Sequence, residues 1–206
     1  MEFFIADTHF YHEKLLLSEH FSPRPYNNLP DEHAGLIDAW NQRVDEKDTV
    51  YHLGDIAMMN HVRPEKHAHE LVADILNQLK GHIVFIKGNH DSRSLFKYLA
   101  AHSPVLADGN AKFDFEDVGR IVKANHHQFF LTHYPLILGQ TQNSINLHGH
   151  IHHTMVAIPE NINVGVDSAD LDYLPADKKP IWGSPLSLEE VEVIMQRKHD
   201  DFAKRR

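Results

Sequence analysis

Apolar and amphipathic stretches alternate along the first half of the chain. Strands are predicted at Glu2–Ala6, Thr49–Leu53 and His82–Ile86, and the first and last of these are apolar enough to be buried on both faces. Between them, the spacing of apolar residues predicts helices over Asp31–Arg43 and Pro64–Leu79. A further helix is expected after Asp91 or Ser92, either of which is able to cap it. This alternation is typical of an α/β fold with a parallel sheet.

The second half has a different pattern, with short strand-like runs and few helical stretches. The runs are Lys112–Phe115, Arg120–Val122, Gln128–Leu131, Ser144–Leu147, Met155–Ile158 and Asn161–Val164. They predict a second sheet packed face to face on the first. A last helix is expected over Ser187–His199, because Ser187 and Glu190 have the spacing of a capping box.

A single domain over residues 1–206 is expected, since this length supports one good-sized core and no boundary is evident. The stretch Asp167–Pro185 contains three prolines and little periodicity. We therefore predict a long surface excursion over residues 167–185, which could serve as a lid or a contact surface.

Composition narrows the class of protein. The chain is 42% hydrophobic and 24% charged, as in ordinary soluble proteins, and no apolar run approaches the roughly 18 residues that span a bilayer. It has no cysteine, which excludes disulfides and thiolate chemistry, and its N-terminus lacks the basic region of a secretory signal. A cytoplasmic protein without membrane association is expected; nothing indicates an oligomeric state.

The formal net charge of −9 disfavours stable binding of duplex nucleic acid. It leaves room for a nucleotide or a short strand, because bound divalent cations would reverse the local field. The expected partner is a small phosphorylated substrate.

Polar clusters stand where predicted strands end. The ends of parallel strands meet at one crevice, so these clusters are expected to converge on a single site. They are Asp7-Thr8-His9, Gly54-Asp55, Gly88-Asn89-His90-Asp91, Thr132-His133, and Gly149-His150-Ile151-His152. Carboxylate, imidazole and amide donors without thiolate favour Mn, Fe, Ni or Zn, with Mg also possible.

Two spacings support a metal site. Asp7 and His9, like His150 and His152, are alternate residues of a segment expected to be extended, so each pair points one way. Two ions about 3.5–4 Å apart need a bridging ligand, and the carboxylate of Asp55 is the natural one.

Most of the 19 histidines need no chemical role. Those expected to lie in polar or helical surroundings are His61, His67, His69, His102 and His199. Four others adjoin the motifs and could support ligands, and the sequence does not choose among them: His126, His127, His148 and His153. Asp91 is either an orienting partner of His90 or a helix cap.

With all five clusters in this order, the sequence resembles the calcineurin-like metallophosphoesterase superfamily. The sequence around these clusters is similar to that of the small single-domain branch of this superfamily from bacteria and phages. The similar segments include Tyr11-His12, Arg24-Pro25-Tyr26 and Tyr51–Asp55. The resemblance implies an α/β fold, a four-layer α/β/β/α sandwich of two packed mixed sheets flanked by helices.

The resemblance also assigns roles. It implies one ion held by Asp7, His9 and His152, a second held by Asn89, His133 and His150, and Asp55 bridging them. It implies that His90 protonates the leaving group or stabilises the transition state. His12 and Arg24 are expected to contact the phosphate or the leaving group, although His12 could equally be a helix-entry residue and Arg24 an exposed loop residue.

The function expected is hydrolysis of phosphate mono- or diesters of a small compound such as a nucleotide or cyclic nucleotide, with diesters and Mn favoured. A hydroxide between the two ions would attack phosphorus in line with the leaving oxygen. Ile56–Asn60 lacks the second acid and the arginine that protein phosphatases of the superfamily carry after Gly-Asp, which disfavours phosphoproteins. The alternatives are a nuclease of short or single-stranded nucleic acid and a non-catalytic metal-binding scaffold.

Overall fold

The computed structural model describes residues 1–59, 62–139, 141 and 143–205, and its first sheet is built on the predicted βαβ rhythm. Four of its five strands are parallel, and the short last strand runs antiparallel to β1. The strand order is β4 (Phe113–Glu116), β3 (His82–Ile86), β2 (Thr49–His52), β1 (Glu2–Ile5) and β9 (Leu186–Ser187).

The second sheet is also mixed. Its order is β5 (Gly119–Ala124), β6 (His127–Thr132), β7 (Ser144–His148) and β8 (Asn161–Asn163). β5 and β6 form an antiparallel hairpin, and β6, β7 and β8 are parallel. The sheets meet at Ala6, whose N–H donates to the carbonyl of Val164 at 3.2 Å and whose carbonyl accepts from Val166 at 3.2 Å.

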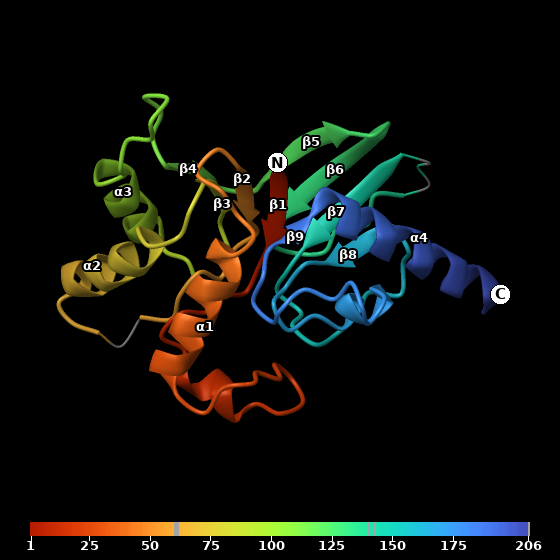
Figure 1. The fold of residues 1–206 in the computed structure, drawn as a ribbon, viewed down its shortest axis with the longest axis horizontal. Coiled ribbons are helices and arrows are strands. Elements are labelled where there is room, and N and C mark those ends of the chain that lie inside the picture. Colours follow the sequence, from red (N-terminus) through yellow and green to blue (C-terminus); the bar gives the residue numbers. More distant parts are fainter. Residues whose placement is uncertain (60–61, 140, 142, 206) are drawn as a thin grey trace.

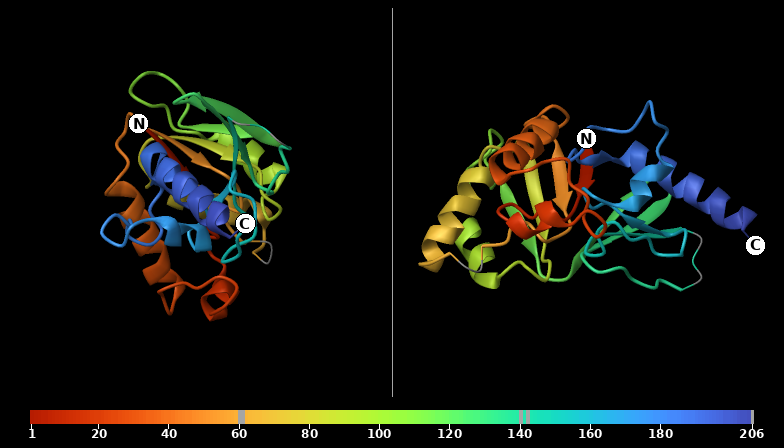
Figure 2. Two further views of the ribbon diagram at one scale, coloured as in Figure 1. Left: turned by 90° about the vertical axis from the view of Figure 1, so that its right-hand side faces the viewer. Right: turned by 90° about the horizontal axis from the view of Figure 1, so that it is seen from below.

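Helices flank both sheets (Figure 1). α1 (Leu29–Asn41), α2 (Glu65–Leu76) and α3 (Arg93–Ala101) pack on the first sheet, and α4 (Leu188–Lys204) lies toward the second. Two further views place α2 and α3 at one end of the molecule and α4 at the other (Figure 2). Two short 3-10 helices, η1 (Glu13–Leu17) and η2 (Ala169–Tyr173), lie in the connections. The predicted α/β sandwich of two mixed sheets is confirmed.

The period-two alternation of β1 divides the apolar residues into two cores. Phe3 and Ile5 pack with the helices of the first sheet, whereas Phe4 and Ala6 pack against the second sheet and α4. All four are at most 2% exposed, as expected for a strand buried on both faces. Because the first sheet is covered on both faces, its strand ends are fixed in position.

Local chemistry explains most helix boundaries. α1 begins two residues before the predicted Asp31, because the side chain of Asn28 accepts from the Asp31 N–H and Pro30 occupies the first turn. Ser92 caps α3, and Ser187 with Glu190 forms the predicted capping box of α4. Among the described residues, no helix has the length and apolar character needed to cross a membrane.

Two predictions about the second half were wrong, and one strand was not predicted. The run near Lys112–Phe115 forms β4 of the first sheet, since its main chain pairs with β3. Met155–Ile158 is not a strand, because the segment between β7 and β8 turns there. β9 is a two-residue strand and too short to give a periodic pattern.

The predicted surface excursion over residues 167–185 is only partly at the surface. Residues 176–179 are exposed, but Asp167, Asp170 and Ser184 are buried. The correction has a physical reason. Proline and low periodicity show that a segment is irregular, and they do not show how deeply its polar side chains are buried.

A buried ion pair fixes α4 to the second sheet. Lys198 is fully buried, and its ammonium group donates to the carboxylate of Asp170 at 2.9 and 3.0 Å and to the carbonyl of Asn161 at 2.6 Å. Asp170 also accepts from the Asn163 N–H of β8 at 2.8 Å. One ammonium group therefore connects α4, η2 and β8.

Lys198→Met is expected to lower the free energy of unfolding by about 3–5 kcal/mol, because it leaves the Asp170 carboxylate buried without a cation. The double variant Lys198→Met with Asp170→Asn should lose less of the free energy of unfolding, because no isolated charge remains buried. Urea unfolding at neutral pH measures both. Equal stability of Lys198→Met and the unchanged protein would contradict the role given to this pair.

Candidate metal centre

The seven predicted ligands come together at one end of both sheets. Each follows the C-terminal end of a strand: β1, β2 and β3 in the first sheet, and β6 and β7 in the second. Neighbouring parallel strands end at the same edge, so the loops after them converge. The side chains brought together are those of Asp7, His9, Asp55, Asn89, His133, His150 and His152.

Six of these side chains form two groups that could each hold a metal ion. Within each group, the donor atoms lie within 4.8 Å of one another. The first group is Asp7, His9 and His152, and the second is Asp55, His133 and His150. Each group offers a carboxylate and two imidazoles, a donor set suited to borderline divalent metals.

Asn89 and Asp55 complete the arrangement. The side-chain oxygen of Asn89 lies 2.8 Å from Nε2 of His133 and 2.8 Å from Nδ1 of His150, so it belongs with the second group. Oδ2 of Asp55 lies 3.5 Å from Nε2 of His9 and 3.4 Å from Nε2 of His133. Asp55 therefore stands between the groups, in the position of a shared ligand.

The backbone at these residues is strained. Five of the seven predicted ligands have a positive φ, a backbone conformation that residues other than glycine rarely adopt. They are Asp7, His9, Asp55, His150 and His152, with φ between 47° and 73°. The prediction that the segments Asp7–His9 and His150–His152 are extended was therefore wrong, although the members of each pair still converge. Such strain, about 1–3 kcal/mol per residue, typically gathers at functional sites.

Two glycines allow the loops to approach this closely. A Cβ on Gly88 would lie 2.2 Å from Oδ1 and 2.3 Å from the backbone nitrogen of Asp55. A Cβ on Gly149 would lie 2.5 Å from Oδ2 of Asp7 and 2.5 Å from the methyl group of Ala6. These contacts are shorter than van der Waals distances, so the glycines of both motifs are required by packing around the carboxylates.

Asp91 has a role that the sequence did not reveal. Its carboxylate accepts from the backbone N–H groups of Gly88 at 2.8 Å, Asp55 at 2.8 Å and Ile56 at 3.0 Å. It neither caps α3 nor bonds to the His90 ring; instead it ties the loop after β2 to the loop after β3. The relative positions of Asp55 and Asn89 depend on this carboxylate.

Arg24 requires a correction, because it does not face the substrate side of the site. Its side chain is fully buried and donates to the carbonyls of Asp7 at 2.8 Å and Thr8 at 2.9 Å and to Glu32 at 2.8 Å. The guanidinium group also lies 3.6 Å from Asp167. Arg24 supports the loop after β1, and the predicted contact with a phosphate was wrong.

Asp167 is a supporting residue that the sequence reading missed. Oδ2 of this buried carboxylate accepts from Nδ1 of His152 at 2.9 Å and from the Ser22 hydroxyl. The bond fixes the His152 ring and leaves Nε2 as its free donor atom. The residue stands outside every motif, in a stretch with no periodic pattern, so no local signal could have found it.

The electrostatics of the site suit a cation. Burial, with the nearby Asp167 charge, raises the pKa of Asp7 to about 7, and burial holds the pKa of His9 well below its usual value. His9 therefore stays neutral, and its buried Nε2 has no hydrogen-bond partner among the described residues. A neutral imidazole with an unused nitrogen beside clustered carboxylates fits a metal ligand.

His12 and His90 lie beside the first group. Nδ1 of His12 is 3.2 Å from Nδ1 of His9, and burial together with the charge of His90 lowers the pKa of His12 to about 4. Nε2 of His90 is 3.9 Å from Oδ2 of Asp55, and its side chain is 30% exposed. Both rings are within reach of a molecule bound over the two groups.

The remaining histidines separate as follows. Of the four that adjoin the motifs, His148 and His153 support the loops near the site, through the Gly149 and Asp167 carbonyls at 2.9 and 3.0 Å. His126 and His127 stand at the β5–β6 turn, at the opposite end of β6 from the site. Of the histidines expected to have no chemical role, His67 and His69 lie on α2, His102 lies at the end of α3 and His199 lies on α4. His61 lies outside the described residues.

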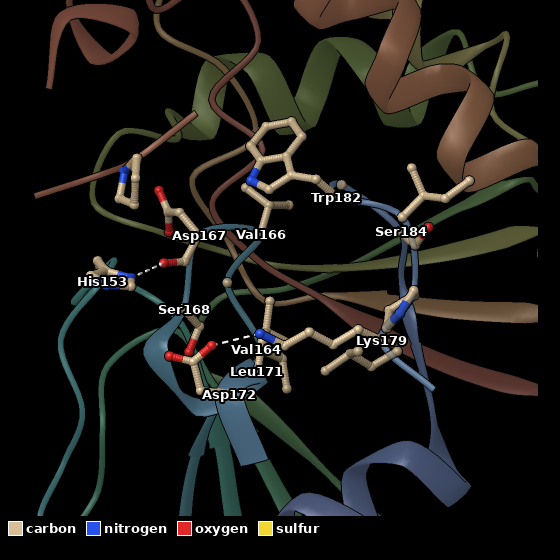
Figure 3. Close-up of a pocket in the computed structure, with 16 residues that line it drawn as sticks. His153, Val164, Val166, Asp167, Ser168, Leu171, Asp172, Lys179, Trp182 and Ser184 are labelled. Carbon is tan, nitrogen blue, oxygen red and sulfur yellow. Dashed lines mark hydrogen bonds and ion pairs between the residues drawn. The ribbon is translucent and has the colours of Figure 1, made fainter. Parts of the chain in front are cut away.

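A cavity of about 240 Å³ lies behind the site (Figure 3). Asp167 lines it on one side, and in this view Lys179 and Ser184 lie on the other side. An ion pair between Asp172 and Lys179, 2.6 Å long, crosses its rim. Asp167 therefore lines this cavity and also bonds to Nδ1 of His152.

A family model described as calcineurin-like phosphoesterase matches residues 3–198 of the chain. An uncharacterized protein of Methanocaldococcus jannaschii, MJ1445, is 32% identical over 70% of this chain and 79% of its own length. The Gene 66 protein of Mycobacterium phage L5 is 23% identical, covering 96% of this chain and 95% of its own.

Among solved structures, a protein of unknown function from Aquifex aeolicus, AQ665, has a similar fold. The TM-score is 0.62 with 22% sequence identity, covering 93% of this chain and 97% of the other. This likeness supports the fold described above.

Gly149→Ala is expected to weaken metal binding by about 10- to 100-fold, the range typical of disturbed ligand support. Its Cβ would displace the Asp7 carboxylate. Metal content after dialysis against a competing chelator measures the effect. Gly35→Ala is the control, because the three atoms nearest to its Cβ all belong to the phenol end of Tyr26, which is not a predicted ligand. Unchanged metal content in Gly149→Ala would refute the packing argument.

Arg24→Met is expected to cost about 3–5 kcal/mol of folding free energy, since Glu32 and Asp167 would lose their buried cation. The stability of Arg24→Lys should lie between those of Arg24→Met and the unchanged protein, because lysine keeps the positive charge and lacks the planar guanidinium group. Urea unfolding tests this. If an Arg24 variant kept full stability and metal content but lost activity, the result would instead support the originally predicted contact of Arg24 with the substrate.

Proposed function

This chain belongs to the calcineurin-like phosphoesterase family, and we propose that it hydrolyses phosphate esters of small molecules with two divalent metal ions. Membership of this family implies a metal-dependent phosphoester hydrolase. The observation that carries the proposal is the position of Asp55. Its Oδ2 lies 3.5 Å from a donor atom of the first group and 3.4 Å from one of the second.

Seven residues would hold the ions. Asp7, His9 and His152 would bind the first, Asn89, His133 and His150 the second, and Asp55 both. Bound there, two cations would acidify a water molecule and offset the charge on phosphoryl oxygens. The two groups contain six of the seven predicted ligands, and the side-chain oxygen of Asn89 lies beside His133 and His150 of the second group.

His90 is proposed as the residue that protonates the leaving oxygen. Its ring is partly exposed and stands beside Asp55 without belonging to either group, so it is free to meet an ester bound over the site. Its backbone N–H donates to Oδ1 of Asp55 at 2.8 Å, which fixes the loop that carries it. A hydrogen bond or proton from His90 would lower the barrier to departure of the oxygen.

His12 is proposed as a substrate contact. It lies against the rings of His9 and His90, with ring centroids 5.0 and 6.0 Å apart. With its low pKa it is neutral at physiological pH, so it would offer a hydrogen bond to the phosphate or the leaving group rather than a charge.

The finer features of the proposal rest on the sequence. The missing acid and arginine after Asp55 argue against phosphoprotein substrates. The net charge of −9 argues for a small substrate such as a nucleotide or cyclic nucleotide over duplex nucleic acid. We propose a preference for diesters, Mn as the activating metal and a cytoplasmic location.

The test is hydrolysis of bis-p-nitrophenyl phosphate and of p-nitrophenyl phosphate by protein stripped with chelator and then supplied with Mn. Activity should depend on the added metal, with the diester hydrolysed faster. Asp55→Asn should fall to the rate of the stripped protein, because both groups lose their shared carboxylate.

His90→Asn is the matched variant. It should keep two metals per chain and lose about 10²–10⁴-fold in kcat on a diester with an alkoxide leaving group, as expected for loss of a general acid. The loss should be smaller on the p-nitrophenyl esters, because p-nitrophenolate leaves without a proton. Stripped protein that stays inactive after addition of Mn, Fe, Ni or Zn would overturn the proposal. His90→Asn with full activity would remove only the role of His90.

A further inference from the structure

Two aromatic side chains are exposed beside the metal centre. All the phenylalanines, tyrosines and tryptophans of the chain lie in its described part, and only Phe21 and Tyr134 are exposed among them, by 53% and 51%. The other aromatic side chains are buried or partly buried. Exposure of large apolar rings is therefore confined to this one place.

Each ring packs against a predicted metal ligand, and the two ligands belong to different groups. The ring centroid of Phe21 is 4.5 Å from that of His152, in the first group. The centroid of Tyr134 is 4.6 Å from that of His150 and 5.1 Å from that of His133, both in the second group. Each ring thus packs against a different one of the two groups.

Hydrogen bonds to their main-chain carbonyls fix the backbone from which both rings project. The carbonyl of Phe21 accepts from the N–H of His153 at 3.0 Å, which joins its loop to the turn carrying His152. The carbonyl of Tyr134 accepts from the Thr132 hydroxyl at 2.7 Å. Their positions are set by the same loops that set the ligands.

A ring that served only to cover a histidine would gain most by being buried itself. About half of the surface of each residue remains open to solvent, although burying an aromatic side chain would be favourable. An open aromatic face next to a reaction centre is suited to stacking on a flat ring of a ligand.

We propose that Phe21 and Tyr134 contact the substrate and select phosphodiesters that carry a flat aromatic or heteroaromatic ring on each side of the phosphate. This inference rests on the proposed function and deepens it. A phosphodiester has two substituents, and a phosphate held over Asp55 would direct them toward the two rings. The net charge of −9 favours a small diester over a long polyanion.

The test compares two diesters with the same leaving group. Benzyl p-nitrophenyl phosphate and cyclohexylmethyl p-nitrophenyl phosphate differ in the flatness of one ring and have closely similar size. The unchanged protein with Mn should favour the benzyl ester in kcat/KM by about tenfold, the scale of one stacked ring.

Substitution by leucine keeps an apolar cover on the histidines and removes the flat face. At least one of Phe21→Leu and Tyr134→Leu, and the double variant, should bring the ratio toward one while the metal content stays at two per chain. Leu17→Ala and Ile137→Ala are the controls, because these side chains are 83% and 87% exposed on the same two loops. Both should leave the ratio unchanged.

The possible outcomes distinguish a failure of this inference from a failure of the proposed function. Hydrolysis of both esters at equal rates by the unchanged protein would overturn this inference and leave the proposed function standing. Hydrolysis of neither ester with any of the four metals would overturn the proposed function itself. Leucine variants that lose metal and slow both esters equally, with the ratio kept, would show that the rings only cover the ligands.

Discussion

Three carboxylates, those of Asp7, Asp55 and Asp167, are buried where the two sheets meet, and their negative charge has to be balanced there. Arg24 is the cation that the chain supplies, and it lies deep, bonded to Glu32 and to the carbonyls after β1. It leaves Asp7 with a pKa raised by burial and by the Asp167 charge. The three buried carboxylates therefore favour the binding of a further cation on the side where the histidines lie.

The same constraint explains the strained backbone. For the ligands to converge, the chain must turn sharply directly after its strands, at residues that have a Cβ. The turns are held by pairing between loops: Asp7 N–H donates to the carbonyl of Gly54 at 3.0 Å, and His9 N–H donates to that of Asp55 at 3.0 Å. Asp91 ties the next loop to this pair. The cost of positive φ is offset by hydrogen bonds that exist only when all three loops are in place.

Strands β1, β2 and β3 of the first sheet and the cluster of ligand side chains could be predicted from sequence, because buried strands are apolar and the ligands directly follow them. Lys112–Phe115 could not be assigned to its sheet, since local pattern does not record which strand is its neighbour. The roles of Arg24, Asp91 and Asp167 depend on partners far away in the chain. Asp167 bonds to Ser22, 145 residues before it, and nothing near either residue indicates that contact.

The meeting of the sheets at Ala6 has a consequence for how the molecule assembles. The first group takes two donors from the loop after β1 and one from the loop after β7; the second takes donors from the loops after β2, β3, β6 and β7. Each ion would thus cross-link the two halves of the sandwich, in addition to the apolar packing, the bridge at Ala6 and the hydrogen bonds between their loops. Docking of the two sheets and loading of the metals would then be thermodynamically linked, each favouring the other.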